Sequence, residues 1–289
     1  MMSAAPAPRE IRDFVFTDAD FRAIAEIAHR EFGLNLQSAK KPLVASRLAK
    51  RLRGLGVQNV KAYLARLEDR EELTALLSLL TTNVTHFFRE QHHFTYLRER
   101  VLPPLLDHAR RGGRVRLWSA GCSSGQEPYS IAMTVLGLYP NAADLDIRLL
   151  ATDIDPVVVD RGRRGVYDRE ELAAIPREHH KYCMLNMRLG RQFRMADPVR
   201  RLVTFGVMNL VVDLPVKGPF DVIFCRNVAI YFDKATQQKV WASFGRVMGP
   251  SAHLFIGHSE RISGSAASGM RSVGITIYEK AAGVQPRIG

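Results

Sequence analysis

The sequence contains little of what builds disulfide frameworks, metal centres or membrane spans. It has three cysteines in 289 residues and no CxxC pair, so neither a disulfide framework nor a zinc site is expected (Cys122, Cys183, Cys225). No apolar run approaches the roughly 18 residues that a membrane helix needs. The Ala/Pro-rich start lacks the apolar core of a signal peptide. We therefore expect a cytoplasmic protein that does not insert into a membrane.

The sequence also lacks the motifs of several large enzyme classes. Neither GxGxxG nor GxxxxGK[ST] occurs, which argues against a dinucleotide-dependent dehydrogenase and excludes a P-loop phosphate cradle. There is no obvious Ser/His/Asp or Cys/His set for nucleophilic catalysis. Two pairs of adjacent histidines, 92–93 and 179–180, make poor joint metal ligands because neighbouring side chains point apart on a helix. We expect no bound metal.

Charge is the most unbalanced feature of the composition. Lys and Arg number 41 against 29 Asp and Glu, which leaves a formal net charge of +12. Such an excess favours an acidic partner, which could be nucleic acid, an anionic membrane face or an acidic protein surface. A basic surface that only aids solubility is the alternative. Charge alone does not choose among these.

The first part of the chain has helical periodicity and no strand signal. After a disordered leader at 1–12, we expect a helical domain at 13–85 and a linker helix within 86–113. In the first helix, Thr17 or Asp18 is the N-cap and Gly33 the C-cap. Further helices are predicted at 38–53, 59–67, 71–80 and 92–110.

From residue 114 to 289, strands alternate with helices. We predict strands at 114–120, 147–151, 202–206, 221–224, 253–257 and 270–279. Helices are predicted at 127–138, 156–164 and 233–248, the last capped by Gly249-Pro250. This alternation indicates an α/β domain with a doubly wound, mainly parallel sheet. The polar stretch 166–200 interrupts it and indicates an inserted subdomain, placed at about 176–202.

Three segments follow predicted strands and can carry chemistry. In 117–128 (LWSAGCSSGQEP), Gly121 and Gly125 let the backbone approach a ligand, and Glu127 suits a positive charge. In 151–155 (ATDID), Asp153 can accept both hydroxyls of a ribose. In 224–233 (FCRNVAIYFD), Arg226-Asn227 would lie beside the same crevice. Plain turns and helix caps are the alternatives, but the first two together favour an adenosine ligand.

These segments, with three other blocks, resemble the bacterial chemotaxis receptor methyltransferases, the CheR family. The matching blocks stand in one order along nearly the whole chain: TTNVTHFFRE, WSAGCSSGQEPYS, ATDID, VMNL, FCRNVAIYFDK and FIGHSE. The resemblance implies an all-helical N-terminal domain, then a Rossmann-like methyltransferase domain with a small inserted antiparallel β-subdomain. It also implies methyl transfer from S-adenosylmethionine to receptor glutamates, with S-adenosylhomocysteine as product.

The resemblance also implies roles for particular residues. Asn83, Thr85 and Arg89 would line the methionine end of the cofactor and the transfer site, with Glu127 near its ammonium group. Asp153 would hold the ribose, and Asn209 and Leu210 would lie along the adenine. Arg226 and Asn227 would close the pocket near the sulfonium. The full set of cofactor-binding residues predicted is Asn83, Thr85, Arg89, Gly121, Glu127, Asp153, Asn209, Leu210, Arg226 and Asn227.

A glutamate acceptor simplifies the chemistry that the protein must supply. Its carboxylate, with an unperturbed pKa of about 4.3, is already a nucleophile at neutral pH. Catalysis then depends mainly on positioning. Arg89 can hold the acceptor carboxylate by a bidentate fork and Tyr231 can orient it with its hydroxyl, so these two are the predicted catalytic residues.

The predicted second helix offers a docking surface for the acidic methylation helices of receptors. The basic residues predicted to dock are Lys40, Arg47, Lys50, Arg51 and Arg53, and an ordinary solvated face is the alternative. Relatives that bind the receptor's C-terminal tether carry a Gly-rich loop, whereas the stretch 184–193 has only Gly190. We therefore expect tether-independent action by a monomer that is recruited to membrane receptor arrays.

Two other functions fit parts of the sequence. An RNA or DNA methyltransferase would use the positive charge, but no Asn/Asp-Pro-Pro-aromatic motif or aromatic-interleaved basic platform is present. A non-catalytic receptor adaptor that senses S-adenosylmethionine would be marked by a broken pocket, yet the predicted pocket residues are all present. We expect no nucleic-acid partner.

Overall fold

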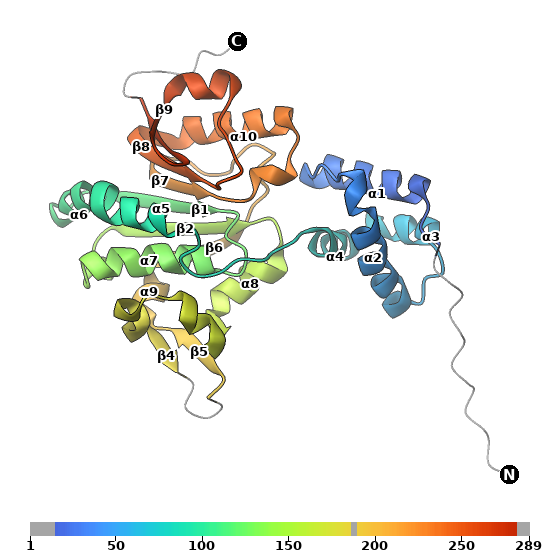
Figure 1. Cartoon of the computed structure of the whole chain (residues 1–289), viewed down its shortest axis with the longest axis horizontal. Helices are drawn as coiled ribbons and strands as arrows, with labels where there is room; N and C mark the ends of the chain where they lie inside the picture. Colours follow the sequence, from blue (N-terminus) through green and yellow to red (C-terminus); the bar gives the residue numbers. More distant parts are fainter. Residues whose placement is uncertain (1–14, 186–189, 282–289) are drawn as a thin grey trace. The chain divides into compact units, whose positions relative to one another are not determined.

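A computed structural model describes residues 15–185 and 190–281 of the chain. The leader expected at 1–12 lies outside these residues, as do 186–189 of the stretch compared with tether-binding loops. The chain divides into two compact units between Thr82 and Asn83. Figure 1 shows the first unit in blue to cyan and the second in green to red. Among the described residues, no helix combines the length and apolar character needed to cross a bilayer.

The first unit is a small helical bundle. Its helices, with two short 3₁₀ turns, are α1 (Asp18–Phe32), η1 (Ser38–Lys40), α2 (Lys41–Leu55), α3 (Val60–Leu64), η2 (Ala65–Glu68) and α4 (Arg70–Leu80). The predicted caps of α1 are confirmed: Thr17 and Asp20 form a capping box, and Gly33 closes the helix at φ 71°. Apolar residues at helical spacing, among them Ile24 and Leu48, are fully buried and make the core.

The second unit contains a seven-stranded sheet in the order β6-β2-β1-β7-β8-β10-β9. Its strands are β1 (Val115–Ala120), β2 (Ile147–Asp153), β6 (Val203–Val207), β7 (Phe220–Cys225), β8 (Met248–Ile256), β9 (Met270–Gly274) and β10 (Ile277–Lys280). The first five in the sheet order are parallel, and β10 is antiparallel to both neighbours.

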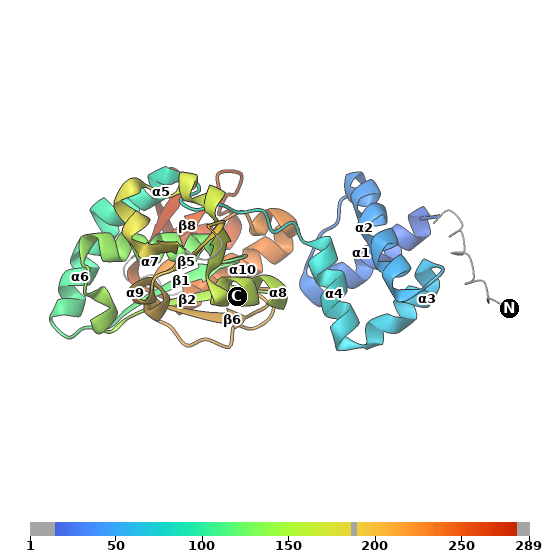
Figure 2. The ribbon, with the colours of Figure 1, turned by 90° about the horizontal axis from the view of Figure 1, so that it is seen from below.

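Helices cover both faces of this sheet (Figure 2). The helical elements are α5 (Gln91–Tyr96), a π-helical turn (Leu97–Val101), α6 (Leu102–Arg110), α7 (Gln126–Leu138), η4 (Ala142–Asp144), α8 (Pro156–Arg164), η5 (Arg169–Ala174), η6 (Arg177–Tyr182), α9 (Asp197–Leu202), η7 (Ala229–Tyr231), α10 (Lys234–Val247) and η8 (Gly264–Gly269). Leu117 belongs to the main core with residues of α5 to α7. Trp118, the next residue of β1, contacts Phe244 of α10 at 5.3 Å between ring centroids. Alternate side chains of one strand therefore pack under helices on opposite faces, as a doubly wound fold requires.

A second, three-stranded sheet lies between α8 and α9 in the sequence. It has the order β3-β5-β4 and is antiparallel, with β3 (Val166–Asp168), β4 (Cys183–Leu185) and β5 (Gln192–Met195). The subdomain was placed at about 176–202, but the sheet also includes β3, which starts ten residues earlier. The predicted fold class, with its helical domain, doubly wound α/β domain and inserted antiparallel sheet, is confirmed.

Two local predictions are wrong. Gly249-Pro250 does not cap a helix; α10 ends at Val247, Met248 is extended, and the pair lies within β8. The single strand predicted at 270–279 is two strands, which turn at Ile275 and at Thr276 with φ 55°. Gly249-Pro250 indicated a change of backbone direction but not which element follows it. The turn at 275–276 has neither glycine nor proline at its two central positions, so the sequence did not indicate it.

Candidate active site

Three neighbouring strands end at the same level of the large sheet. In register, Ala120 of β1 lies opposite Thr152 of β2, and Ser119 lies opposite Phe224 of β7. The loops after these strands therefore emerge side by side, at the edge where open α/β sheets bind their ligands. The three segments selected from the sequence are brought together here.

The loop after β1 has an unusual backbone. Gly121 and Gly125 have φ of 87° and 98°, and Ser123 has φ of 48°. A Cβ at Gly121 would collide with Val228, and one at Gly125 would lie 2.7 Å from the Tyr167 hydroxyl oxygen. Only glycine fits at these two positions, so the loop forms a close-fitting cradle beside the sheet edge.

An aspartate cluster lies at the end of β2 and consists of Asp153, Asp155, Ser123 and Asn83. The Asp153 carboxylate accepts hydrogen bonds from the backbone N–H groups of Ser123 (2.8 Å) and Asp155 (3.1 Å). The Asn83 side-chain amide donates to Asp155 Oδ2 at 2.9 Å, and the Asn83 backbone carbonyl accepts from the Ser123 hydroxyl at 3.0 Å. Burial raises the pKa of Asp153, while the N–H donors oppose that effect. Asn83 thus lies against the second strand end, and its predicted role at the methionine end stays a prediction.

A glutamate–arginine cluster lies at the ends of β1 and β7 and consists of Arg226, Glu127 and Glu90. Arg226 Nη1 is 3.3 Å from Glu127 Oε2, and Nη2 is 3.5 Å from Glu90 Oε2. Nη2 also donates to the Arg89 carbonyl, and Ser119 donates to Glu127 at 2.7 Å. The Arg226 side chain is only 2% exposed. It lies between the two glutamates, and its predicted role in closing the pocket near the sulfonium stays a prediction.

This cluster carries one more negative than positive charge. Burial raises the pKa of Glu127, but the Arg226 guanidinium favours its ionised form. His93 lies 3.4 Å from Glu90, and burial with the nearby Arg226 charge lowers its pKa to about 3, so it is neutral. With both carboxylates ionised, they outnumber the one guanidinium, in a chain of net charge +12. Glu90 Oε1 also lies 3.2 Å from His258 Nδ1. Such a site favours a cationic ligand.

A metal ion is a poor candidate for that ligand. Among the described residues, Glu90, His92 and His93 place potential ligand atoms within 4.8 Å of one another. Arg226 Nη2, however, lies 3.5 Å from Glu90 Oε2. Its positive charge opposes a divalent metal ion at that carboxylate.

A buried carboxylate that the sequence analysis missed shapes the loop after β7. Glu260 is 4% exposed and accepts backbone hydrogen bonds from Gly257 (2.5 Å), Asn227 (3.0 Å), Val228 (2.9 Å) and Ala229 (2.7 Å). Burial raises the pKa of Glu260, and these donors oppose that effect. Asn227 has φ of 59°. Glu260 therefore fixes a strained turn that leads directly to Tyr231.

The remaining predicted cofactor and catalytic residues lie on segments that adjoin these clusters, in the sequence or through a backbone hydrogen bond. Arg89 is half-buried and lies between two residues with positive φ, Phe88 and Glu90; its guanidinium is 3.5 Å from the Val84 carbonyl. Thr85 and Tyr231 are also half-buried. The Met208 N–H donates to the Asp153 carbonyl at 2.9 Å, which brings Asn209 and the buried Leu210 next to the aspartate cluster.

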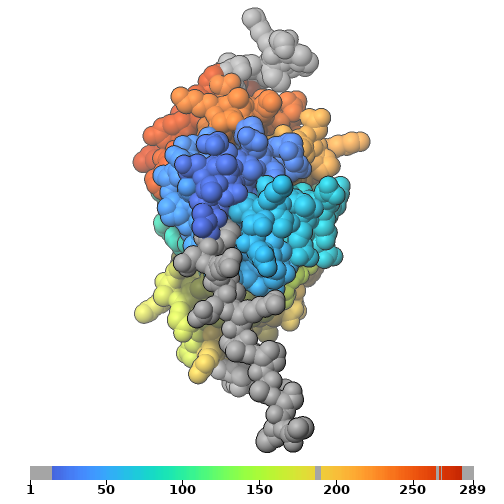
Figure 3. Space-filling view, turned by 90° about the vertical axis from the view of Figure 1, so that its right-hand side faces the viewer, coloured from blue at the N-terminus to red at the C-terminus, as the bar shows by residue number. Residues whose placement is uncertain are grey.

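The predicted docking residues lie in the first unit, whose surface is in blue to cyan in Figure 3. Lys50 and Arg53 are exposed. Arg47 instead donates to the Leu79 and Thr81 carbonyls at 2.8 and 2.9 Å, and Arg51 donates to Glu72 at 3.0 and 2.6 Å. Lys40 is half-buried. Two of the five basic side chains thus join α2 to α4 and its C-terminal end, which the helical period alone could not show.

Both units match models of one protein family. Residues 19–81 match the all-alpha domain of CheR methyltransferases, and residues 83–278 match their SAM-binding domain. The chain belongs to the CheR methyltransferase family. The family resemblance, the enzyme class and the cofactor predicted from the sequence are confirmed, and this CheR chain is a methyltransferase that uses S-adenosylmethionine.

Similar proteins match this CheR chain across both units. A probable chemotaxis protein methyltransferase of Rhizobium etli is 48% identical over 255 residues, which cover 86% of the chain and 95% of that protein. The chemotaxis protein methyltransferase of Escherichia coli is 41% identical, over 86% of each chain. Chemotaxis protein methyltransferase 2 of Pseudomonas aeruginosa is 38% identical over 93% of the chain and 96% of that protein.

Proposed function

We propose that this enzyme methylates glutamate side chains on methyl-accepting chemotaxis receptors and so forms glutamate methyl esters for sensory adaptation. The observation that carries the proposal is the likeness to chemotaxis protein methyltransferases along both units, the helical one included. A glutamate carboxylate also fits the chemistry, because it is ionised at neutral pH and needs no general base. The acceptor is therefore activated before it reaches the enzyme.

The crevice has the chemistry to hold S-adenosylmethionine. The cofactor supplies an electrophilic methyl group on a sulfonium, and it carries an ammonium group as well. Glu127 binds the ammonium group, Asp153 accepts the ribose hydroxyls, and Asn209 with Leu210 lies along the adenine. Gly121 lets the backbone approach closely. The net negative charge of the glutamate–arginine cluster, described above, supports this placement.

Other predicted residues act around the methyl group. Asn83, Thr85, Arg89 and Asn227 line the transfer side of the crevice, and Arg226 acts through the two glutamates that it holds. Arg89 binds the acceptor carboxylate and Tyr231 orients it, so that one oxygen lies in line with the bond that breaks. Such positioning can contribute roughly 7–11 kcal/mol at best.

The exposed basic residues of α2 dock on the acidic methylation helices. Because Arg47 and Arg51 are bound within the helical unit, we assign docking to the exposed Lys50 and Arg53. Reversing Lys50 and Arg53 to Glu should raise KM for the receptor several-fold and weaken its salt dependence. The matched control reverses Lys61 and Arg70, which are also exposed and lie on α3 and α4. Equal KM values for the two double variants would contradict docking through α2.

The β-subdomain does not bind a receptor tether in this proposal. Gly190 is the only glycine in 184–193, where tether-binding relatives have a Gly-rich loop. Calorimetry with a peptide of the receptor's C-terminal tether should therefore give no binding heat. Saturable heat at micromolar peptide would show that tether independence is wrong, without affecting the proposed reaction.

One experiment separates the candidate functions. Radiolabelled S-adenosylmethionine is incubated with the enzyme and receptor-containing membranes, and with RNA in a parallel tube. Base-labile label on the receptor is expected, because a carboxyl methyl ester hydrolyses in base. Label on RNA alone would indicate a nucleic-acid methyltransferase. Tight cofactor binding without transfer to either would favour a sensing adaptor.

A further inference from the structure

A side chain of the inserted sheet, that of Tyr167 in β3, contacts the glycine loop at 121–125. Its hydroxyl donates a buried hydrogen bond of 2.8 Å to the backbone carbonyl of Ser124. Tyr167 is 4% exposed and lies 43 residues away from Ser124 in the sequence. A residue of the insertion is thus bonded to the backbone of the loop that we place against the cofactor.

The bonded carbonyl lies in the most strained part of the loop. Ser123 has φ of 48° and Gly125 has φ of 98°, so Ser124 stands between two left-handed residues. A non-glycine residue keeps such a conformation only where its surroundings hold it. The Ser123 N–H is held by Asp153 at 2.8 Å, and the Ser124 carbonyl is held by Tyr167. These two bonds hold the peptide group before Ser123 and the peptide group after Ser124.

The Tyr167 ring is itself immobilised by aromatic neighbours. It meets Phe87 edge-on, with 4.9 Å between ring centroids, and lies 5.7 Å from Phe193 of β5. Phe193 is fully buried and pairs with Tyr167 in the sheet register. Phe87 stands two residues before Arg89, on the segment proposed to hold the acceptor. The ring therefore joins the inserted sheet to two parts of the candidate active site.

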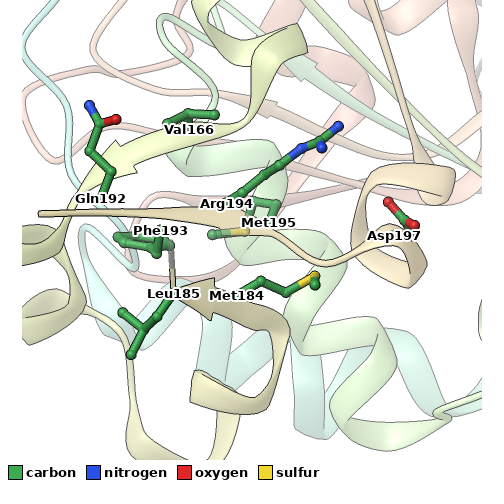
Figure 4. A pocket seen from close by; sticks show the side chains of 8 residues that line it. All are labelled: Val166, Met184, Leu185, Gln192, Phe193, Arg194, Met195 and Asp197. Carbon is green, nitrogen blue, oxygen red and sulfur yellow. The ribbon is translucent and has the colours of Figure 1, made fainter. Parts of the chain in front are cut away.

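The other side of β3 has a different environment. Val166 is 41% exposed and lines a cavity of about 310 Å³ on the inserted sheet, together with Met184, Leu185 and Arg194 (Figure 4). None of the residues predicted to bind the cofactor lines this cavity. Successive residues of a strand point to opposite faces. Tyr167 is thus the residue that β3 directs toward the loop.

We propose that Tyr167 is a positioning residue for the cofactor: it holds the 121–125 loop in its binding conformation, so that the inserted sheet is a working part of the cofactor site. This inference rests on the proposed placement of the cofactor at that loop. A loop that is released from Tyr167 samples other conformations, and cofactor binding must then select the competent one.

Tyr167→Phe removes the hydroxyl and keeps the ring. The chain offers a control of the same kind, because the Tyr129 hydroxyl donates to the Gly162 carbonyl, also at 2.8 Å, and Tyr129 is also buried. Its ring lies 6.1 Å from that of Tyr167, but its hydroxyl bonds outside the 121–125 loop. Both variants should lower Tm by a similar amount. Only Tyr167→Phe should raise the Kd for S-adenosylhomocysteine, by about tenfold, and KM for S-adenosylmethionine with it, while kcat at saturating cofactor is retained.

Two further outcomes decide what a negative result means. An unchanged Kd in Tyr167→Phe, or an equal rise in Tyr129→Phe, would overturn the positioning role. Asp153→Asn, measured in parallel, tests the placement of the cofactor by itself. A normal Kd in Asp153→Asn would remove the basis of the inference. A raised Kd in Asp153→Asn together with an unchanged Kd in Tyr167→Phe would reject only the role of Tyr167.

Discussion

Each unit of the molecule contains one arginine that binds a buried glutamate, and the two arrangements differ in their charge balance. In the helical unit, Arg51 donates two hydrogen bonds to Glu72, and its side chain is 39% exposed. In the methyltransferase unit, Arg226 is 2% exposed and lies between Glu90 and Glu127. The first arrangement is electrically neutral and joins two helices. The second leaves one negative charge, which is available to a cationic ligand.

Their energetic roles should differ in the same way. A half-exposed ion pair contributes about 1 kcal/mol or less, because water already solvates the partly exposed group. A buried guanidinium that balances two carboxylates cannot be removed without leaving uncompensated charge in a place that water does not reach. The comparison thus predicts that one arginine mainly supports the helical bundle, whereas the other is needed for both the fold and the ligand site.

The largest effect is expected from Arg226→Met. Removing this guanidinium should lower the free energy of unfolding of the second unit by about 3–5 kcal/mol, whereas Arg51→Met should cost the first unit about 1 kcal/mol. Both tryptophans, Trp118 and Trp241, belong to the second unit, so their fluorescence in urea follows that unit alone. Circular dichroism follows the unfolding of the helical unit in Arg51→Met. Equal losses of unfolding free energy in Arg226→Met and Arg51→Met would contradict the comparison.

An intermediate effect is expected from Glu127→Gln. The exchange makes the glutamate–arginine cluster neutral and removes a charged partner for the ligand. The Kd for S-adenosylhomocysteine should therefore rise roughly 10- to 100-fold, since a hydrogen bond to a charged group contributes about 1.5–3 kcal/mol. Glu72→Gln, the same exchange in the neutral pair, should leave the Kd unchanged. Calorimetry that finds normal affinity in Glu127→Gln would contradict the assignment of Glu127.

The smallest effect is a difference in pH dependence. The hydrogen bond from Arg51 lowers the pKa of Glu72, so its contribution to stability is present above the unfolded-state pKa and is lost as the pH falls. Burial raises the pKa of Glu127, so its contribution is present at low pH and is lost as the pH rises. As the pH falls from 7 to 4, the free energy of unfolding of the wild type relative to that of Glu72→Gln should decrease. Over the same range, the free energy of unfolding of the wild type relative to that of Glu127→Gln should increase. Changes of the same sign in urea titrations would refute this.

Much of the fold follows from local patterns. Gly33 ends α1, the strands β1, β2, β6 and β7 lie close to their predicted positions, and α8 has the predicted bounds. These elements depend on caps and apolar periodicity, which are written in neighbouring residues. The strands of the inserted sheet could not be placed individually. They are three or four residues long, and their stability depends on partners elsewhere in the chain.

Candidate site residues could be selected from the sequence where they lie at or just after the end of a parallel strand. Asp153 was found because it ends a parallel strand, and the same reasoning applied to β8 would have indicated Glu260, four residues after that strand ends. Glu90 had no such signal, since it follows no strand and its meaning depends on Arg226. The ion pair between Arg51 and Glu72 could not be predicted for the same reason, because helical periodicity within α2 does not indicate a partner on another helix.

The contact between Tyr167 and the glycine loop limits how this enzyme can be shortened or recombined. Residues 166–195 resemble a removable appendage, because a compact sheet interrupts an otherwise regular alternation of strands and helices. A deletion across them would leave the Ser124 carbonyl without its donor and Phe87 without the ring that covers it. Chimeras made within the family should therefore take the insertion and the loop at 121–125 from the same parent protein.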